Sequence, residues 1–235
     1  MKFKKYDSRF QAGEILAELI SNLNDSLKKS IRNNPNSFFC FAIPNGGIPV
    51  AEGFCNTFKI NYDILIVRKI KIPFNPEAGF GSITTDGSIL FNESLLGHIN
   101  LSEDQVEKSI SLTKREIEER LELYNKTQNL EDLYKEHILD KEIFMIDDGL
   151  ASGFTMLAAI QMVKKYHPKS IYIAVPTAPL HTTKRIEKIG NIDKIFCPNV
   201  RDVWQFAVAE AYQHWYDLPE SEVLELLSNS KYYIQ

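Results

Sequence analysis

Thirteen consecutive residues combine an apolar run, an acidic pair and a glycine-bearing loop that leads into an amphipathic helix. The run is Ile143-Phe144-Met145-Ile146-Asp147-Asp148-Gly149-Leu150-Ala151-Ser152-Gly153-Phe154-Thr155. Its first four residues predict a strand that is buried on both faces, and Met156, Ile160 and Val163 follow at the spacing of a helix. The loop therefore lies where a strand ends and a helix begins.

This loop is suited to an anion. The first N–H groups of a helix have no intrahelical partner and carry partial positive charge, so residues 151–155 could bind a phosphate, with two hydroxyl groups as further donors. The carboxylates of Asp147 and Asp148 can accept hydrogen bonds from vicinal ribose hydroxyls. The segment predicts a site for a phosphorylated sugar, although an acidic pair after a strand can also hold magnesium or cap a turn.

The whole pattern resembles the phosphoribosyl diphosphate (PRPP) signature of the type I phosphoribosyltransferases: an apolar strand, two acidic residues, a few small or apolar residues, Thr or Ser, Gly, any residue, and Thr or Ser. The resemblance implies that Asp147 and Asp148 bind the ribose hydroxyls. It implies that the 5′-phosphate is bound by Ala151, Ser152, Gly153, Phe154 and Thr155.

A second loop follows the apolar run Phe38–Ile43. It contains Asn45, Gly46 and Gly47, and two adjacent glycines allow the backbone to approach a ligand closely. In the type I family the loop after the first strand binds the diphosphate of PRPP, so the resemblance gives this role to these three residues.

A pair of cations, Arg68 and Lys69, follows the apolar run Ile64–Val67. If that run is a strand parallel to the first, both side chains should lie at the same crevice and contact the diphosphate. We expect these two residues to be catalytic, because the charge of the departing diphosphate must be stabilised. The alternative is a pair of ordinary ion pairs at the rim of the sheet.

A wider resemblance extends from about residue 7 to about residue 180. It is to a bacterial and archaeal family of predicted phosphoribosyltransferases to which no acceptor has been assigned. The segments that carry it, besides 143–155, are Asp7-Ser8-Arg9, Ala12-Gly13, Leu16, Pro44 to Ala51, Val67-Arg68-Lys69, Asn75-Pro76-Glu77, Gly81 to the Asp86-Gly87 turn, and Asn92-Glu93.

The elements that must position these loops are apolar runs alternating with helical patterns. This alternation predicts an α/β fold in which a parallel sheet of about five strands is covered by helices on both faces. The expected strands are 38–43, 64–67, 143–146, 171–175 and 194–197, and the expected helices lie near 10–30, 48–58, 154–166 and 181–189.

The chain is expected to be a single type I phosphoribosyltransferase-like domain over residues 1–235, with two appendages. One is a long flexible insertion, residues 70–140, with a hairpin turn at Asp86-Gly87 and a long helix after Leu101 whose start carries Ser102 and Gln105 in capping-box spacing. The other is a small hood formed by the N-terminus and residues 198–235.

The hood segment is rich in aromatic residues. An aromatic cluster there could stack on a planar base, or it could be a core that fastens the last helix to the body. The residues concerned are Trp204, Phe206, Tyr212, His214, Trp215 and Tyr216.

Composition narrows the function further. The chain has 235 residues and a net charge of −4, which argues against a nucleic-acid partner. It contains neither a Walker-type phosphate loop nor a G-x-G-x-x-G motif. Three separated cysteines among apolar residues and the lack of an apolar leader or membrane-length run predict a cytoplasmic protein with no membrane partner.

The expected activity is the transfer of the phosphoribosyl group of PRPP to or from a nitrogenous acceptor, for which a nucleobase is one candidate, with release of diphosphate. The resemblance implies that Mg²⁺ is held mainly by PRPP oxygens, so no protein metal ligand is expected. Two alternatives stay open: a non-catalytic sensor of PRPP or nucleotides, and a hydrolase or phosphorylase of phosphorylated ribosides. The sequence is compatible with a monomer or a homodimer.

Overall fold

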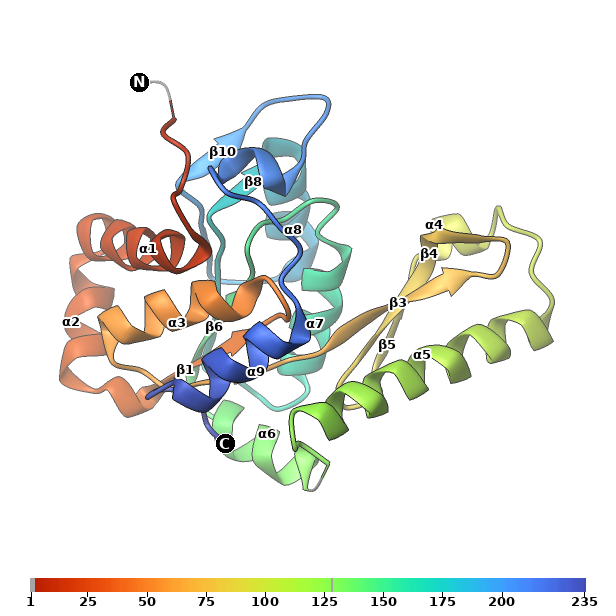
Figure 1. Ribbon diagram of the computed structural model, residues 1–235, viewed down its shortest axis with the longest axis horizontal. Helices are drawn as coiled ribbons and strands as arrows, with labels where there is room; N and C mark the ends of the chain where they lie inside the picture. Colours follow the sequence, from red (N-terminus) through yellow and green to blue (C-terminus); the bar gives the residue numbers. More distant parts are fainter. Residues whose placement is uncertain (1–2, 128) are drawn as a thin grey trace.

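A five-stranded parallel sheet forms the centre of the computed structural model, which describes residues 3–127 and 129–235 (Figure 1). Every neighbouring pair of its strands is parallel. In spatial order the strands are β2 (Tyr62–Ile64), β1 (Phe38–Ala42), β6 (Glu142–Ile146), β7 (Ser170–Ala174) and β9 (Lys194–Phe196). The predicted α/β class and parallel sheet are confirmed.

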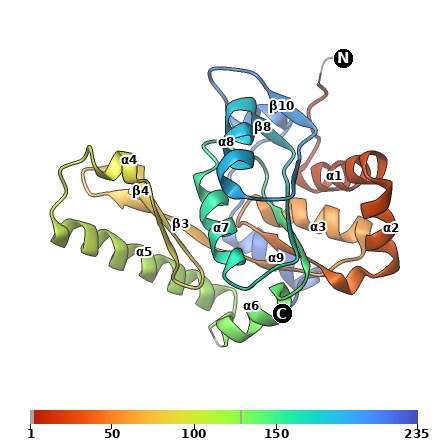
Figure 2. The ribbon, with the colours of Figure 1, turned by 180° about the vertical axis from the view of Figure 1, so that it is seen from behind.

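Helices cover both faces of this sheet, because its strands are apolar on both sides. Alternate residues of β1 illustrate this: Phe38 and Cys40 belong to one hydrophobic cluster, and Phe39 and Phe41 belong to the other. The first face carries α1 (Arg9–Leu23), α2 (Asp25–Asn33), α3 (Gly47–Phe58) and α9 (Glu220–Asn229). The second face, seen in Figure 2, carries α6 (Leu130–Ile138), α7 (Phe154–Lys164) and α8 (Leu180–Gly190). A 3-10 turn (Pro35–Ser37) leads into β1.

The predicted strand 64–67 is wrong in its bounds. The apolar run is divided between the end of β2 and the start of β3 (Val67–Ile72), which belongs to a different sheet. Residues Leu65 and Ile66 are buried but lie outside both strands. The hydroxyl of Thr85 accepts from the Ile66 N–H at 2.8 Å and donates to the Ile66 carbonyl at 3.1 Å. The Thr85 side chain thus takes the place of a neighbouring strand as the hydrogen-bond partner of the Ile66 backbone. The apolar pattern of residues 64–67 does not show whether the partner is a strand or a side chain.

The second sheet forms an arm that extends away from the central sheet (Figure 1). It consists of β3, β4 (Asn75–Thr84) and β5 (Ile89–Phe91), all antiparallel, followed by α4 (Glu93–Leu96) and the long α5 (Glu103–Leu123). The Asp86-Gly87 turn joins β4 to β5, and both bonds of the capping box at Ser102 are present, so these two predictions are confirmed. The last part of the predicted 70–140 insertion is not in the arm, because α6 packs into the core.

A smaller sheet lies at the other end of the chain. Strand β8 (Thr177–Pro179) pairs in parallel with β10 (Asn199–Arg201), and a 3-10 turn (Val208–Ala211) follows. The N-terminus joins this region, since the Tyr6 N–H donates to the Ala211 carbonyl at 2.9 Å and the Gln213 N–H donates to the Tyr6 carbonyl at 2.8 Å. Only the first part of the predicted 198–235 hood belongs to this region around β8 and β10. The later part, α9, packs against the hydrophobic core of the central sheet.

Two glycines set the distance between α1 and α3. A Cβ on Gly13 would lie 2.0 Å from the Val50 carbonyl oxygen, and a Cβ on Gly53 would lie 2.1 Å from the Phe10 carbonyl oxygen. The two helix backbones therefore touch, which only glycine allows. This contact fixes the start of α1 beside the loop that precedes α3.

The C-terminus is fastened by a buried ion pair. The Lys126 ammonium lies 3.2 Å from the Asp63 carboxylate and donates to the Ile234 carbonyl at 2.6 Å, and both side chains are almost fully buried. The last residues pair with β2, since the Ile234 N–H donates to the Tyr62 carbonyl at 3.0 Å. No helix in residues 3–127 and 129–235 is long and apolar enough to cross a bilayer.

Replacing Lys126 by Met should lower the free energy of unfolding by about 3 to 5 kcal/mol, because Asp63 would lose the cation that compensates its buried charge. The double variant Asp63→Asn/Lys126→Met should recover part of this loss. Denaturant titration measures both. Lys29→Met, which removes an exposed pair with Asp25, is the matched control and should cost less than about 1 kcal/mol. Equal losses for the two lysines would contradict the assignment.

Burial raises the pKa of Asp63 from 3.8 to about 6, and Lys126 opposes this rise. The folded state thus binds the proton more tightly than the unfolded chain, so the contribution of this group to stability is complete below about pH 4 and is lost as the pH rises to about 6. The free energy of unfolding of the wild type, relative to that of Asp63→Asn, should fall across this interval. A pH-independent difference would show that Asp63 is not the titrating group.

Candidate functional site

Two loops meet at the carboxyl ends of the adjacent strands β1 and β6. The chain continues from β1 toward β2 on one side, whereas β6 pairs on the other, so the winding of the sheet reverses between them. Ligand sites of open α/β sheets lie at such a reversal. The loop 43–47 follows β1 and the loop 147–153 follows β6, and the Ile43 N–H donates to the Ile146 carbonyl at 2.9 Å.

Glycines bring the first loop into contact with the acidic pair. A Cβ on Gly46 would lie 1.9 Å from Oδ2 of Asp148, and a Cβ on Gly47 would lie 2.8 Å from the Ile146 carbonyl oxygen. A larger residue at Gly47 would push against the backbone of β6, and one at Gly46 would displace the Asp148 carboxylate. The Pro44–Asn45 peptide bond in this loop is cis. The structure thus brings together the residues predicted to bind diphosphate and those predicted to bind ribose.

The second loop has the form of an anion cradle. Gly153 precedes α7 with φ of 71°, a conformation that favours glycine, and has no side chain to cap the helix. The Ser152 hydroxyl accepts from the Phe154 N–H at 3.4 Å. Two carbonyls of the loop have donors from α8: the Thr182 hydroxyl donates to Ala151 at 2.7 Å, and the Arg185 guanidinium donates to Ser152. The predicted phosphate residues 151–155 therefore form a loop that is held at two carbonyls and leads directly into the N-terminus of α7.

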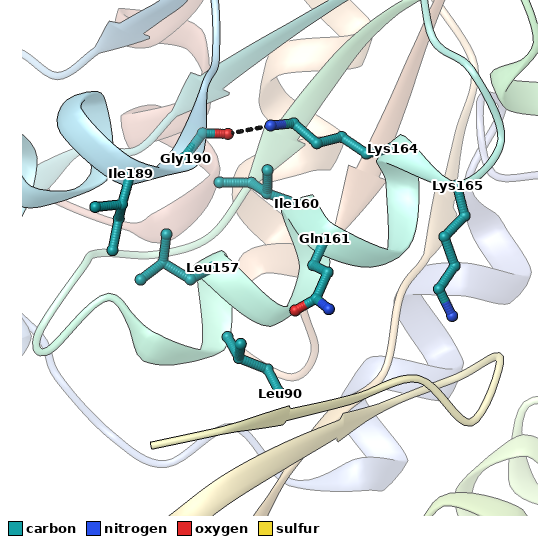
Figure 3. A pocket seen from close by; sticks show the side chains of 8 residues that line it. All are labelled: Leu90, Leu157, Ile160, Gln161, Lys164, Lys165, Ile189 and Gly190. Atoms are coloured by element: carbon teal, nitrogen blue, oxygen red, sulfur yellow. Dashed lines mark hydrogen bonds between the residues drawn. The ribbon is translucent and has the colours of Figure 1, made fainter. Parts of the chain in front are cut away.

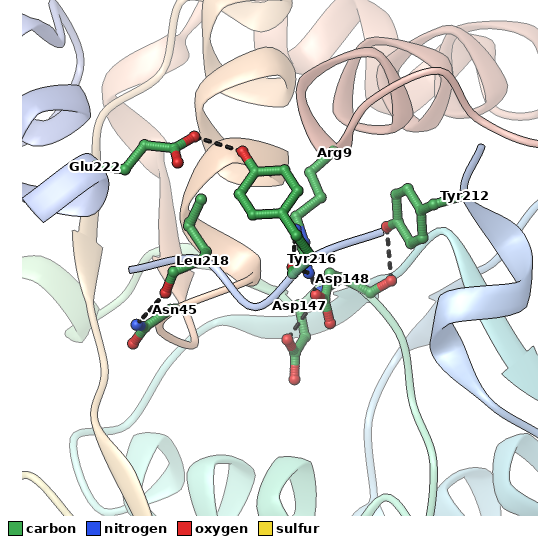
Figure 4. Close-up of polar contacts among 8 residues, drawn as sticks. All are labelled: Arg9, Asn45, Asp147, Asp148, Tyr212, Tyr216, Leu218 and Glu222. Atoms are coloured by element: carbon green, nitrogen blue, oxygen red, sulfur yellow. Dashed lines mark hydrogen bonds and ion pairs between the residues drawn. The ribbon is translucent and has the colours of Figure 1, made fainter. Parts of the chain in front are cut away.

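The two carboxylates have different partners (Figure 4). Asp148 is paired with Arg9, whose Nε lies 2.9 Å from Oδ2, and the two side chains are 15% and 8% exposed. Asp147 accepts the Asp148 N–H at 2.8 Å and forms no salt bridge with any described residue. Burial and the neighbouring charge of Asp148 raise the pKa of Asp147 well above its usual range. Burial also raises the pKa of Asp148, and Arg9 opposes that rise.

Arg9 belongs to one of the segments that resemble the phosphoribosyltransferase family, but the sequence predicted no role for it. Its two terminal nitrogens donate to the Tyr216 carbonyl at 3.2 Å, and its guanidinium lies 4.1 Å from the centre of the Trp215 ring. The Tyr212 hydroxyl donates to the Asp148 carbonyl at 2.7 Å. No sequence spacing could have joined Arg9 to an aspartate 139 positions away.

The predicted diphosphate loop is also tied to distant parts of the chain. The Asn45 side-chain amide donates to the Leu218 carbonyl at 2.9 Å and accepts from Arg120 of α5 at 2.8 Å. Arg120 in turn lies 2.6 Å from Glu220 at the start of α9. The sequence pattern gave no sign of this contact, because Asn45 and Arg120 lie 75 positions apart in the chain.

Arg68 and Lys69 lie in β3 of the arm, not in a strand of the central sheet. The premise of their prediction was wrong, since the strand that contains them is antiparallel. Lys69 donates to the Glu77 carbonyl, and Nε of Arg68 is buried without a hydrogen-bond partner in the described part of the chain. Within the same part, no hydrogen bond or ion pair joins either residue to the acidic pair. Their catalytic role stays a prediction.

The predicted aromatic cluster is divided in the structure. Tyr212, Trp215 and Tyr216 surround Arg9 within 5.8 Å of its guanidinium carbon, and we name these three residues the aromatic clamp. Trp204 is 98% exposed and takes no part in the clamp. His214 is exposed, and Phe206 lies against Arg201.

A cavity of about 500 Å³ lies elsewhere, on the outer side of α7 between β5 and the end of α8 (Figure 3). Its walls are mainly apolar, with Leu90, Leu157 and Ile189 among them. Its two lysines are engaged: Lys164 donates to the Gly190 carbonyl at 2.5 Å, and Lys165 lies 3.6 Å from Asp86. None of the predicted site residues lines this cavity.

Comparison with known proteins agrees with this geometry. The family model of the phosphoribosyl transferase domain matches residues 8–211. Two Mycobacterium tuberculosis proteins, provisionally named phosphoribosyl transferases MT0597 (strain CDC 1551) and Rv0571c (strain H37Rv), are each 26% identical over 230 residues, which is 97% of this chain and 47% of theirs. The chain thus spans about half the length of these curated relatives.

A solved structure supports the fold. The crystal structure of TT1426 from Thermus thermophilus superposes with a TM-score of 0.67 at 20% identity and covers 95% of this chain and 97% of that chain. At this identity the likeness shows the fold alone. The family model covers most of the chain, including both loops and Arg9, and the resemblance found in the sequence is confirmed. The chain belongs to the phosphoribosyl transferase domain family.

Proposed function

We propose that the chain binds PRPP and transfers its phosphoribosyl group to, or from, a nitrogenous acceptor. The observation that carries this proposal is the contact of three ligand-binding features at one edge of the sheet. The glycine loop follows β1, the acidic pair and the start of α7 follow the neighbouring strand β6, and Gly46 lies against Asp148. PRPP has a diphosphate, a pair of vicinal hydroxyls and a 5′-phosphate, so each feature has a matching group.

In the forward direction, the bond between C1′ and the diphosphate oxygen breaks, and a bond between C1′ and the acceptor nitrogen forms. The acceptor loses a proton, and diphosphate leaves. The site would act mainly by aligning the two reactants and by stabilising the charge that develops on the leaving group. Arg68 and Lys69 stay the proposed cations for that charge.

Magnesium would accompany the diphosphate and neutralise part of its charge. No group of three or more His, Cys, Asp or Glu side chains suited to a metal occurs among residues 3–127 and 129–235. The two oxygen-donor side chains at the site, Asp147 and Asp148, suit this hard cation, which keeps most of its shell as water and phosphate oxygens. Oxygens of PRPP and water would therefore supply most of the coordination.

Calorimetric titration of PRPP with Mg²⁺ should show binding by the wild type that is lost in Asp147→Ala and Asp148→Ala, because each variant removes one carboxylate of the proposed ribose site. Ribose 5-phosphate should bind more weakly, since it lacks the diphosphate. Asp193→Ala, which alters a carboxylate at β7 away from the site, is the matched control and should retain binding.

Diphosphate release in the presence of candidate nucleobases then tests the chemistry. Turnover that survives in Asp148→Ala would sink the assignment of the site. Tight PRPP binding without diphosphate release from any acceptor would favour the sensor alternative over the transferase.

Gly46→Ala should abolish or greatly weaken PRPP binding, because the added Cβ cannot coexist with the present position of the Asp148 carboxylate. Gly190→Ala is the matched control, since its Cβ would meet only ordinary contacts at 3.4 Å or more. Calorimetry measures the affinity, and circular dichroism verifies the fold. Unchanged affinity in Gly46→Ala would mean that the contact between the two loops is not needed for binding.

A further inference from the structure

Arg9 is bound on one side by the acidic pair and on the other by the C-terminal segment. Its Nε donates to the Asp148 carboxylate at 2.9 Å, and both terminal nitrogens donate to the Tyr216 carbonyl at 3.2 Å. The side chain is 8% exposed, although it is permanently charged. A charge that is buried this far needs fixed partners, and here they come from Asp148 and from the C-terminal segment.

The aromatic clamp makes such burial tolerable. The guanidinium carbon lies 4.1 Å from the Trp215 ring centre, 5.7 Å from that of Tyr212 and 5.8 Å from that of Tyr216. A guanidinium is planar and weakly hydrated, so it can stack on aromatic rings while its edge donates hydrogen bonds. An ammonium cannot do both, which makes this an arginine site in particular.

The same clamp holds Asp148 at a second point. The Tyr212 hydroxyl donates to the Asp148 backbone carbonyl at 2.7 Å, while Arg9 holds the carboxylate. Asp148 is therefore fixed at both its backbone and its side chain. Asp147 accepts one N–H bond, from Asp148, and has no cationic partner among the described residues. The two carboxylates therefore differ in how firmly they are held: Asp148 has a cationic partner, and Asp147 has only a backbone N–H donor.

We infer that Arg9 is a positioning residue for the acidic pair, which fixes Asp148 against the aromatic clamp and leaves Asp147 as the carboxylate free to accept the ribose hydroxyls. The inference rests on the proposed function, because it divides the ribose-binding role between the two residues. By this inference, the N-terminus and the segment 212–216 set the geometry of the ribose site without contacting the sugar.

The pKa values of the two carboxyls are raised for partly different reasons. Arg9 opposes the rise that burial causes in the pKa of Asp148 and so favours the charged form of this carboxyl. The charge of Asp148 adds to the effect of burial in raising the pKa of Asp147. Loss of Arg9 would remove the group that favours ionisation of Asp148 and the contact that orients it.

Arg9→Met tests the inference, because Met keeps the apolar contact with the clamp and removes the charge and all donors. It should weaken binding of PRPP with Mg²⁺ by roughly 10-fold to 100-fold, the range that a misplaced binding group produces. Arg9→Lys keeps the charge without the planar fork and should lie between Met and wild type. The matched control is Arg115→Met, which removes an exposed ion pair with Glu119 on α5 and should leave binding unchanged.

A double-mutant cycle separates positioning from a general loss of stability. If Arg9 acts through Asp148, then Arg9→Met should cost much less in the Asp148→Asn background than in the wild type, and thermal unfolding should show both variants folded. Additive losses would overturn the inference, as would full PRPP affinity in Arg9→Met. If Arg9→Met fails to fold, Arg9→Lys completes the cycle with the same criteria.

The result also distinguishes the inference from the function on which it rests. Wild-type protein that binds neither PRPP nor ribose 5-phosphate would overturn the proposed function and, with it, the task given to Arg9. Wild-type protein that binds PRPP while Arg9→Met binds it equally well would overturn the inference alone.

Discussion

The site depends on the pairing of β1 with β6, two strands that lie about a hundred positions apart in the chain. Their register joins Phe38 to Glu142 and Ala42 to Ile146, and both strands end at the same edge. Because the side chains of a strand alternate between two faces, a slip by one residue would reverse every contact of β1 and displace its loop by about 3.3 Å. The gap between Gly46 and Asp148 has no room for such a shift.

Around this pair of strands, segments near the two ends of the chain both contact Asp148, Arg9 at its carboxylate and Tyr212 at its backbone carbonyl. Arg9 arrives from the N-terminal side because Gly13 and Gly53 let α1 lie directly on α3. The segment with Tyr212 and Tyr216 arrives from the C-terminal side. A buried ion pair adds little net stability, since desolvation of both charges offsets their attraction, but it defines a single geometry. Stability comes from the apolar clusters on the two faces, and precision at the site comes from these polar contacts.

Sequence patterns predicted correctly those features that depend only on residues close together in the chain. The parallel strands, the Asp86-Gly87 turn and the capping box at Ser102 follow from apolar runs, from turn residues and from hydrogen bonds within three positions. The prediction of a strand at 64–67 was wrong because the buried connection at Leu65 and Ile66 is as apolar as a buried strand. Arg68 and Lys69 therefore lie in β3 of the arm, and their position does not follow from the direction of a strand in the central sheet.

The sequence by itself determined the fold class, the two glycine-bearing loops and the acidic pair, because each of these is encoded by residue types within about a dozen positions. Only the tertiary structure decided which partners those residues have. It assigned Arg9 to Asp148 and Arg120 to Asn45, and it separated Trp204 from the aromatic residues around Arg9. The physical reason is range: an ion pair forms only when packing brings two side chains within about 4 Å, and that packing is set by the whole core.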